Sequence, residues 1–497
     1  MNKVDYTCPE IKVLDVNSDW LDIYEPPSAI SFISWPPSQA EYLKIYLREL
    51  GCKTILVEKH YIDQSFMHDD AAYYVRSLRS YPNFTQRVHF FSRTFDDEWW
   101  RTSVDMAGNG SFLEINRILQ ESYIGFSVVR PLPVSPVGRT VLPAPDKGNS
   151  TFKSIRRHRV HLAGFSLHVD GIPFQSQDQG VSACATTALW SALDCVAANE
   201  AMTISSPASI TESATRYALQ EGRPFPNEGL TVRQICEATL SAGFSPIVVH
   251  GKSPHDDRLQ IHGYAKSGFA PVLALLPING EGSGHAVCCV GIESGKAQPQ
   301  HTPEYKFREL PSGLEGLYIH DDRLGPYAYA KLSSLTDQKS GDVRSCISIE
   351  WPDEIPNDSW FLHAIVVPVP TKLRLTVSRL RRVGLVVAQA IGEALSDPFT
   401  TLDCTFVGSQ KYAERIYRFG LSSDGLYRAV CGTALSRYIG LIEIAGPNGP
   451  VLDIVVDSTE KNSEAAVLAC IKRSGFPSNE MKLFHSVSRV LGVNGIL

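Results

Sequence analysis

The feature that most constrains this chain is an abrupt change from a polar loop to an apolar helix at Cys184. Residues 175–183 are mainly polar and include a glycine, whereas the residues after Cys184 are almost all apolar. The apolar residues recur at helical spacing: Ala185, Ala188, Leu189, Ala192, Leu193, Val196 and Ala197. The pattern predicts a helix over 184–199 that is buried on most sides, with Cys184 in its first turn.

A cysteine in the first turn of a helix is well placed for chemistry. The unpaired N–H groups and the positive end of the helix dipole favour an anionic sulfur there. The thiolate is the nucleophilic form of cysteine, so such a position activates a thiol. The alternative is that Cys184 is one more small apolar residue of a core, and this stretch alone does not decide between the two.

Length and composition limit the remaining possibilities. A chain of 497 residues suggests about three domains. No apolar run approaches the roughly 18 residues of a membrane span, and acidic residues occupy the place of a signal peptide's apolar core. The formal charge of −6 argues against a nucleic-acid binder. We therefore expect no membrane and no nucleic acid among its partners.

The eleven cysteines are odd in number, scattered and often within apolar segments. This usage is typical of reduced thiols in a cytoplasm rather than of a disulfide framework. There is no CxxC pair and no His/Cys cluster at ligand spacing, so we expect neither a structural zinc nor another cofactor. The predicted location is cytoplasmic.

Residues 1–150 are predicted to form a mixed α/β domain of unknown role. A helix is expected over 38–50, and strands over 54–58, 87–92 and 123–130. Prolines and glycines then recur between residues 131 and 148, which indicates a long extended connection. We place the first domain boundary there.

Residues 151–370 are predicted to form the second domain. After the Cys184 helix, helices are expected over 209–221 and 231–242, and strands over 245–250, 270–276, 284–292 and 317–320. Residues 371–497 are predicted to form a third, α+β domain. It would contain a basic amphipathic helix over 377–395, strands over 438–445 and 451–456, and a closing helix over 463–474.

The charges of these three segments differ. The formal net charge, counted as Lys and Arg minus Asp and Glu, is −4 for residues 1–150, −6 for 151–370 and +4 for 371–497. Arg374, Arg379, Arg381 and Arg382 cluster at the start of the last segment. The third domain is therefore expected to pack against the acidic middle domain or to recruit an acidic protein substrate, although a solvated helix face also explains the arginines.

A histidine at the start of a predicted strand is the candidate partner of Cys184. Cysteine catalysis requires an imidazole that takes the thiol proton and a group that orients the imidazole. His285 follows Cys184 by 101 residues and begins an apolar strand, and Gly284 before it leaves the backbone open to close approach. A structural or exposed histidine is the alternative.

These residues occur in an order that resembles a known superfamily. Gln179-Gly-Val-Ser-Ala-Cys184, then Gly284-His285-Ala-Val, then Tyr318-Ile-His-Asp321-Asp-Arg-Leu-Gly325 is similar to the papain-like cysteine peptidases. The closest likeness is to the bacterial branch of bacteriocin (double-glycine) leader peptidases. The resemblance covers about residues 160–370. It implies a central domain in which a buried catalytic helix packs against an antiparallel sheet.

The resemblance also implies roles for individual residues. Cys184 would be the nucleophile, His285 the base, Asp321 the acid that orients it, and Gln179 the oxyanion donor. Two positions depart from the family pattern. The glutamine usually lies six residues before the cysteine, so Gln177 remains an alternative to Gln179, and Asp322 stands where proline is usual and could also orient the base.

The function expected from the resemblance is hydrolysis of a peptide or isopeptide bond through a thioester, with a protein or peptide as substrate. Two alternatives remain: an acyltransferase or transglutaminase-like enzyme on the same triad, and a catalytically inactive papain-like scaffold or sensor. The chain has no Walker-type GxxxxGK[ST] motif, so it is not expected to be an exporter.

Overall fold

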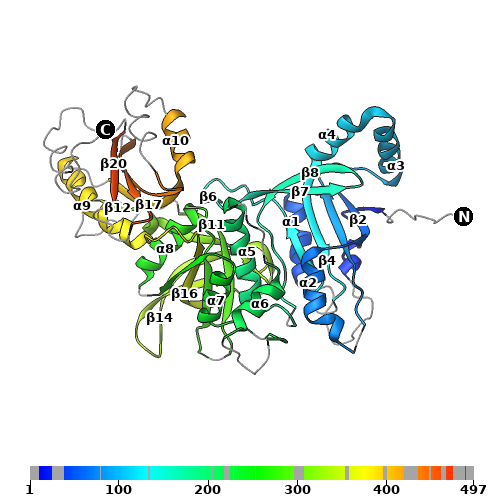
Figure 1. The fold of residues 1–497 in the computed structure, drawn as a ribbon, viewed down its shortest axis with the longest axis horizontal. Coiled ribbons are helices and arrows are strands. Elements are labelled where there is room, and N and C mark those ends of the chain that lie inside the picture. The colour runs from blue at the N-terminus through cyan, green and yellow to red at the C-terminus, as the bar shows by residue number, and fades with distance from the viewer. Residues whose placement is uncertain are drawn as a thin grey trace, which may run out of the picture.

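The protein has an α+β fold whose main sheets lie one after another along its longest axis (Figure 1). The computed structural model describes residues 11–24, 38–78, 80–132, 135–178, 180–200, 202, 205–217, 224–227, 229–251, 253–280, 282–295, 307–352, 357–395, 400–418, 435–446, 449–460, 466–473 and 487. The described strands form sheets of five, eight, five and two strands. None of the helices in these residues combines the length and the apolar composition needed to cross a membrane.

The first sheet is a meander whose strand order follows the sequence. Its strands are β1 (Ile11–Asp15), β2 (Thr54–Tyr61), β3 (Thr85–Phe91), β4 (Tyr123–Val129) and β5 (Val137–Val141). Every pairing is antiparallel because each connection turns the chain back. This part is therefore α+β, and the expected mixed α/β arrangement was wrong. The predicted strands over 54–58, 87–92 and 123–130 are confirmed.

Helices connect these strands. They are η1 (Trp20–Tyr24), α1 (Ser38–Glu49), α2 (Gln64–Ala72), η2 (Tyr74–Arg76), α3 (Asp97–Met106), η3 (Ala107–Ser111) and α4 (Phe112–Ser122). The predicted helix over 38–50 is confirmed as α1. Helices α3 and α4 form a hairpin that projects from the body of the molecule (Figure 1).

A two-stranded hairpin follows the first sheet. Its strands are β7 (Arg156–Leu162) and β8 (Phe165–Gly171). Val160, Leu162 and Phe165 pack into one apolar cluster with Leu56 and Phe91 of the first sheet. The chain thus returns to the first core after the predicted boundary at residue 150.

The largest sheet closes into an antiparallel barrel. Its strands are β10 (Val272–Pro277), β11 (His285–Ser294), β13 (Leu314–Asp321), β14 (Gly325–Thr336), β15 (Val343–Ile349) and β16 (Asp358–Val369). Each pairs with the next, and β16 pairs with β10 to complete the circle. Two further strands, β9 (Ser245–His250) and β6 (Ser150–Thr151), add to β16 and β11. The strands predicted in this part are confirmed.

The helix predicted after the polar loop is α5 (Cys184–Glu200). It packs against β10, β11, β13 and β16 of the barrel, and Leu189, Leu193 and Val196 are buried in the common core. Burial on nearly all sides accounts for the scarcity of polar residues in its sequence. The described residues of this part also form the helices α6 (Pro207–Thr215), α7 (Val232–Ser241) and α8 (Pro254–Lys266).

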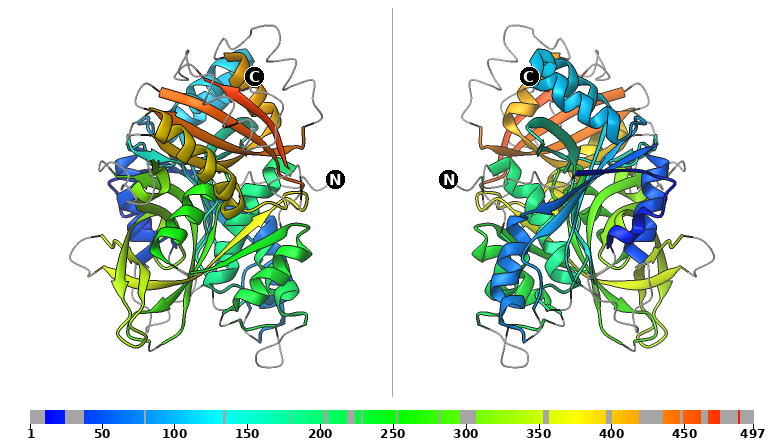
Figure 2. Two further views of the ribbon diagram at one scale, coloured as in Figure 1. Left: turned by 90° about the vertical axis from the view of Figure 1, so that its left-hand side faces the viewer. Right: turned by 90° about the vertical axis from the view of Figure 1, so that its right-hand side faces the viewer.

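The C-terminal sheet contains one strand from the middle of the chain. Its order is β12 (Arg308–Glu309), β17 (Thr401–Gly408), β18 (Tyr438–Gly446), β19 (Gly449–Asp457) and β20 (Val467–Lys472). The short helix η4 (Leu310–Gly313) follows β12. Helix α9 (Val377–Leu395) covers one face, as Figure 2 shows, and α10 (Ser409–Arg418) follows β17.

The predictions for this last part were mostly right. Helix α9 and strands β18 and β19 are confirmed. The closing helix predicted over 463–474 was wrong, because residues 467–472 form strand β20 on β19. Pairing with β19 overrides a local sequence that also suits a helix.

Two groups of charged side chains join the C-terminal sheet to helix α8. Asp403 accepts hydrogen bonds from Lys266 and from His262, the latter at 3.2 Å. Glu309 pairs with Arg381 at 2.6 Å and with His255 at 2.8 Å. One member of the predicted arginine cluster, Arg381, therefore contacts a partner from the middle of the chain.

Gly325 tests how tightly the barrel packs against the N-terminal part. A Cβ atom on Gly325 would lie 2.1 Å from Cδ1 of Tyr42 in α1. We expect Gly325→Ala to lower the free energy of unfolding by about 1–3 kcal/mol through overpacking, measured by urea denaturation. Gly148→Ala is the control, because a Cβ there meets nothing within 4 Å. Equal effects of the two variants would contradict this packing.

Candidate active site

Cys184 is the first residue of α5 and stands at the entrance to the buried helix. It is half-buried, whereas its neighbours Ala183 and Ala185 are buried. The Thr187 hydroxyl donates to the Cys184 carbonyl at 2.9 Å and tightens the first turn. The sequence pattern thus placed the thiol correctly, at a helix N-terminus with access from outside.

The loop before Cys184 is fixed by one carboxylate. Oδ1 of Asp178 accepts hydrogen bonds from the backbone N–H groups of Gly180, Val181 and Ser182, at 3.1, 2.8 and 2.8 Å. This arrangement holds the chain in a tight turn as it enters the helix. Sequence analysis missed Asp178, although an aspartate two residues before a glycine is a signal for such a turn.

The glutamines proposed as oxyanion donors remain predictions. Gln179 lies outside the described residues. Gln177 is half-buried, and no hydrogen bond from its side chain to the described residues is present.

His285 is the first residue of β11, and its side chain faces the start of α5, where Cys184 lies. Its side chain is only 5% exposed. On the neighbouring strand it pairs with Leu275 of β10, and a Cβ on Gly284 would lie 2.9 Å from the Leu275 carbonyl oxygen. Glycine at 284 is thus required for the close approach of the two strands, as the sequence suggested.

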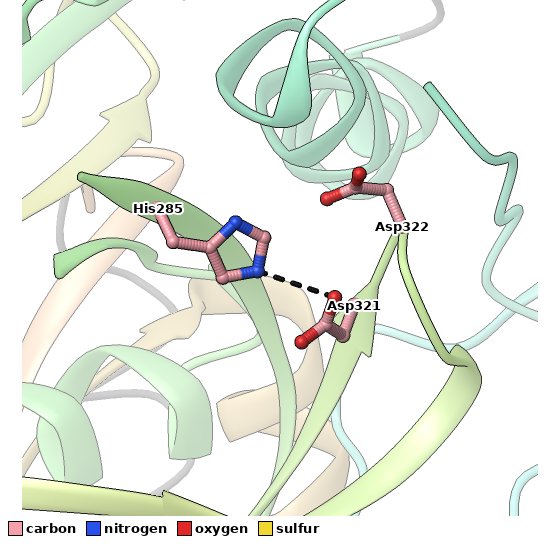
Figure 3. Close-up of side chains that lie close together, drawn as sticks. All are labelled: His285, Asp321 and Asp322. Carbon is pink, nitrogen blue, oxygen red and sulfur yellow. Dashed lines mark hydrogen bonds and ion pairs between the residues drawn. The ribbon is translucent and has the colours of Figure 1, made fainter. Parts of the chain in front are cut away.

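Asp321 is the last residue of β13, the strand that lies beside β11. Its Oδ1 lies 3.2 Å from Nε2 of His285, and the dashed line in Figure 3 marks this bond. Arg323 secures the same carboxylate: its backbone N–H donates to Oδ1 at 2.9 Å, and its guanidinium donates to Oδ2 at 2.9 Å. Asp321 therefore orients the imidazole and is itself held in place.

Asp322 also lies in this cluster, but it does not make the orienting hydrogen bond. Figure 3 shows its carboxylate apart from the bond between His285 and Asp321. Asp322 is buried, and neither of its carboxylate oxygens has a hydrogen-bond partner among the described residues. Burial raises its pKa to about 7.

The Cys184 thiol completes the arrangement. The Cys184 side chain lies close enough to His285 to contribute to the raised pKa of the imidazole. Since Nε2 of His285 is occupied by Asp321, Nδ1 is the nitrogen left for the thiol. The structure thus brings together three of the four residues proposed from the sequence.

The charges of this group favour an ionised pair. Burial lowers the pKa of His285, but the Asp321 carboxylate raises it more, through its charge and its hydrogen bond, to about 10. Burial raises the pKa of Asp321, but His285 and Arg323 hold it well below its usual range. At neutral pH the pair is therefore an imidazolium and a carboxylate.

Aromatic side chains cover this ion pair, and sequence analysis missed them. The ring of Trp360 lies 5.6 Å from the ring of His285. The Arg323 guanidinium lies over both Trp360 and Trp351, at 5.4 and 5.8 Å from the ring centroids. Closure of the barrel brings Trp360 here, because β16 pairs with β10. Such cover excludes water and strengthens the electrostatic interactions beneath it.

The same cluster contains three side chains of the kinds that bind metal ions. One ligand atom each of His285, Asp321 and Asp322 lies within 4.8 Å of the others. However, Asp321 already accepts from His285 and Arg323, and the Arg323 cation beside it opposes a second positive charge. This donor set suits an imidazolium better than a divalent ion.

No protein-family model matches this chain, and no curated protein matches it either.

The two aspartates can be distinguished by titration of His285. Replacing Asp321 with Asn removes the charge that stabilises the imidazolium, so we expect the pKa of His285 to fall by about 1–3. Asp322→Asn should lower it less, because the Asp322 charge contributes less than that of Asp321 and Asp322 makes no hydrogen bond to the ring. The measurement is an NMR pH titration of the His285 ring in both variants. Equal, small shifts would mean that neither residue orients the base.

Proposed function

We propose that the protein is a papain-like cysteine peptidase that hydrolyses a peptide or isopeptide bond. One observation carries the proposal: the imidazole of His285 is hydrogen-bonded through Nε2 to Asp321, and the nearby Cys184 side chain contributes to its raised pKa. A nucleophile, a base and a group that orients the base, linked in this way, are what thiol catalysis requires.

The proposed reaction proceeds in two stages. The Cys184 thiolate attacks the substrate carbonyl carbon, and the resulting oxyanion is stabilised by backbone N–H groups at the start of α5 and by Gln179 or Gln177. His285 then donates its proton to the leaving amine as the C–N bond breaks, which leaves a thioester on Cys184. Water, deprotonated by His285, attacks the thioester and releases the acid and the thiol.

The fold around the site supports assignment to the papain-like superfamily. The nucleophile lies on a buried helix, α5, and the base and the acid lie on adjacent antiparallel strands, β11 and β13, of the sheet beneath it. The order along the chain, Cys184 then His285 then Asp321, is also that of the superfamily. The likeness to bacterial leader peptidases remains a proposal from the sequence motifs.

Two alternatives use the same residues. In an acyltransferase or transglutaminase-like enzyme an amine would replace water in the second stage, and the choice depends on how well the site excludes water. In an inactive scaffold or sensor the triad would be retained without turnover. The ion pair between His285 and Asp321 favours an active enzyme, because a buried charge pair is costly to keep without a function.

The substrate and the setting are also proposals. We infer a protein or peptide substrate and a cytoplasmic location, since the nine described cysteines are all free. The C-terminal sheet would select or position the substrate rather than take part in the chemistry.

The proposal predicts selective reactivity of Cys184. Cys236 in α7 is the internal control, because it is also half-buried and burial raises the pKa of its thiol. At pH 6 we expect iodoacetamide to alkylate Cys184 on the order of tenfold to a hundredfold faster than Cys236, since the imidazolium stabilises the thiolate. Peptide mapping by mass spectrometry gives both rates.

Hydrolysis is tested with a peptide library and the variant Cys184→Ala. We expect the wild type to form products that have gained water, and the folded variant to form none. Added amine that enters the product would favour the acyltransferase. If Cys184 reacts no faster than Cys236, the inactive scaffold is the better description.

A further inference from the structure

The two loops that carry the proposed catalytic residues both rest on the N-terminal part of the chain. One loop, residues 174–183, leads to Cys184. The other, residues 321–325, begins with Asp321. The contacts on the two loops come from α1 and from the first sheet, so residues distant from the triad in sequence hold both loops.

The loop after Asp321 is held by the start of α1. The Gln39 side-chain amide donates to the backbone carbonyl of Asp322 at 2.9 Å. The Ser38 hydroxyl donates to the backbone carbonyl of Arg323 at 2.9 Å. Next to them, the Tyr42 ring occupies the space that a side chain on Gly325 would need. Helix α1 therefore fixes the backbone on the C-terminal side of Asp321.

The loop before Cys184 is attached to β5 of the first sheet. Phe174 and Thr140 exchange backbone hydrogen bonds of 2.9 and 2.8 Å, and the Ser176 N–H donates to the Val137 carbonyl at 3.1 Å. This loop thus begins as an extension of the N-terminal sheet and not of the barrel.

A buried arginine at the end of β4 strengthens the same attachment. The Arg130 guanidinium donates to the backbone carbonyls of Ser135 and Ser176, both at 2.9 Å. It also forms an ion pair of 3.7 Å with Asp178, and both side chains are almost completely buried. Since Asp178 holds the turn that leads to Cys184, Arg130 acts on the nucleophile through it.

We propose that Gln39 and Arg130 are positioning residues that set the distance and angle between Cys184, His285 and Asp321. The inference rests on the proposed function. Gln39 fixes the loop of the acid, and Arg130 fixes the loop of the nucleophile. A displacement of about 1 Å in such a site can cost a hundredfold in rate. The N-terminal part is therefore needed to hold the triad in its active geometry.

The first test replaces Gln39 with Met, which has a similar length but no donor. We expect the pKa of His285 to fall by about 1, because Asp321 is less firmly held, and alkylation of Cys184 at pH 6 to slow about tenfold. The melting temperature should stay within about 2 °C of the wild type, since a single bond at a half-buried residue is lost. The matched control is Glu41→Met on the exposed side of the same helix.

The second test compares Arg130→Lys with Arg130→Met. Lysine keeps the positive charge opposite Asp178 but lacks the planar guanidinium that donates to two carbonyls. We therefore expect Arg130→Lys to be alkylated faster at Cys184 than Arg130→Met, but more slowly than the wild type. The two variants are compared by kcat/KM on a peptide that the wild type cuts and by alkylation of Cys184, with thermal unfolding of the full chain measured alongside.

The outcomes separate this inference from the proposed function. If wild-type Cys184 is inert, the proposed function fails and the inference fails with it. If the wild type is reactive and Gln39→Met matches it in both pKa and rate, the inference alone fails. A loss of stability in Gln39→Met with no change in the pKa of His285, or an equal loss of rate in Glu41→Met, also overturns it.

Discussion

The arrangement around the site depends on one buried ion pair, between His285 and Asp321. Asp321 is completely buried, and an isolated carboxylate there would be costly to remove from water. The imidazole on one side and the guanidinium of Arg323 on the other offset that cost. Arg323 also forms an ion pair with Asp358, at 2.8 Å. Loss of Asp321 would leave the His285 imidazolium buried without its partner, which is strongly destabilising.

The barrel makes this ion pair possible because it sets the register of three strands. β11 carries His285 at its start, and the adjacent strand β13 carries Asp321 at its end. Closure through β10 and β16 then places Trp360 against the imidazole. A shift of one residue in any of these pairings would turn the side chains to the opposite face. Strand register therefore brings the base and its partner to the same end of the sheet.

The sequence predicted the parts of the site that depend on local pattern. The α5 helix, with Cys184 at its start, and the strand beginning at His285 follow from apolar periodicity and from glycine. Arg130 and Trp360 were not found, because their roles arise from contacts between segments distant in sequence. Asp178 was also missed, although the turn that it holds is local. The helix predicted over 463–474 was wrong for a related reason. Residues 467–472 form a strand because they pair with β19, which the local sequence does not reveal.

The middle of the chain is not an independent unit, and the charges at its two boundaries explain why. Arg130 and Asp178 form a buried pair across the N-terminal boundary, and the buried carboxylate of Asp403 pairs with the partly exposed Lys266 across the C-terminal boundary. A single buried charge without its partner is far less stable than the pair. Division of the chain at residue 150 or 370 would therefore leave charged groups unpaired on both sides. Opposite net charges alone could not join the parts so firmly, because salt screens them; the attachment depends on specific pairs in which at least one charge is buried.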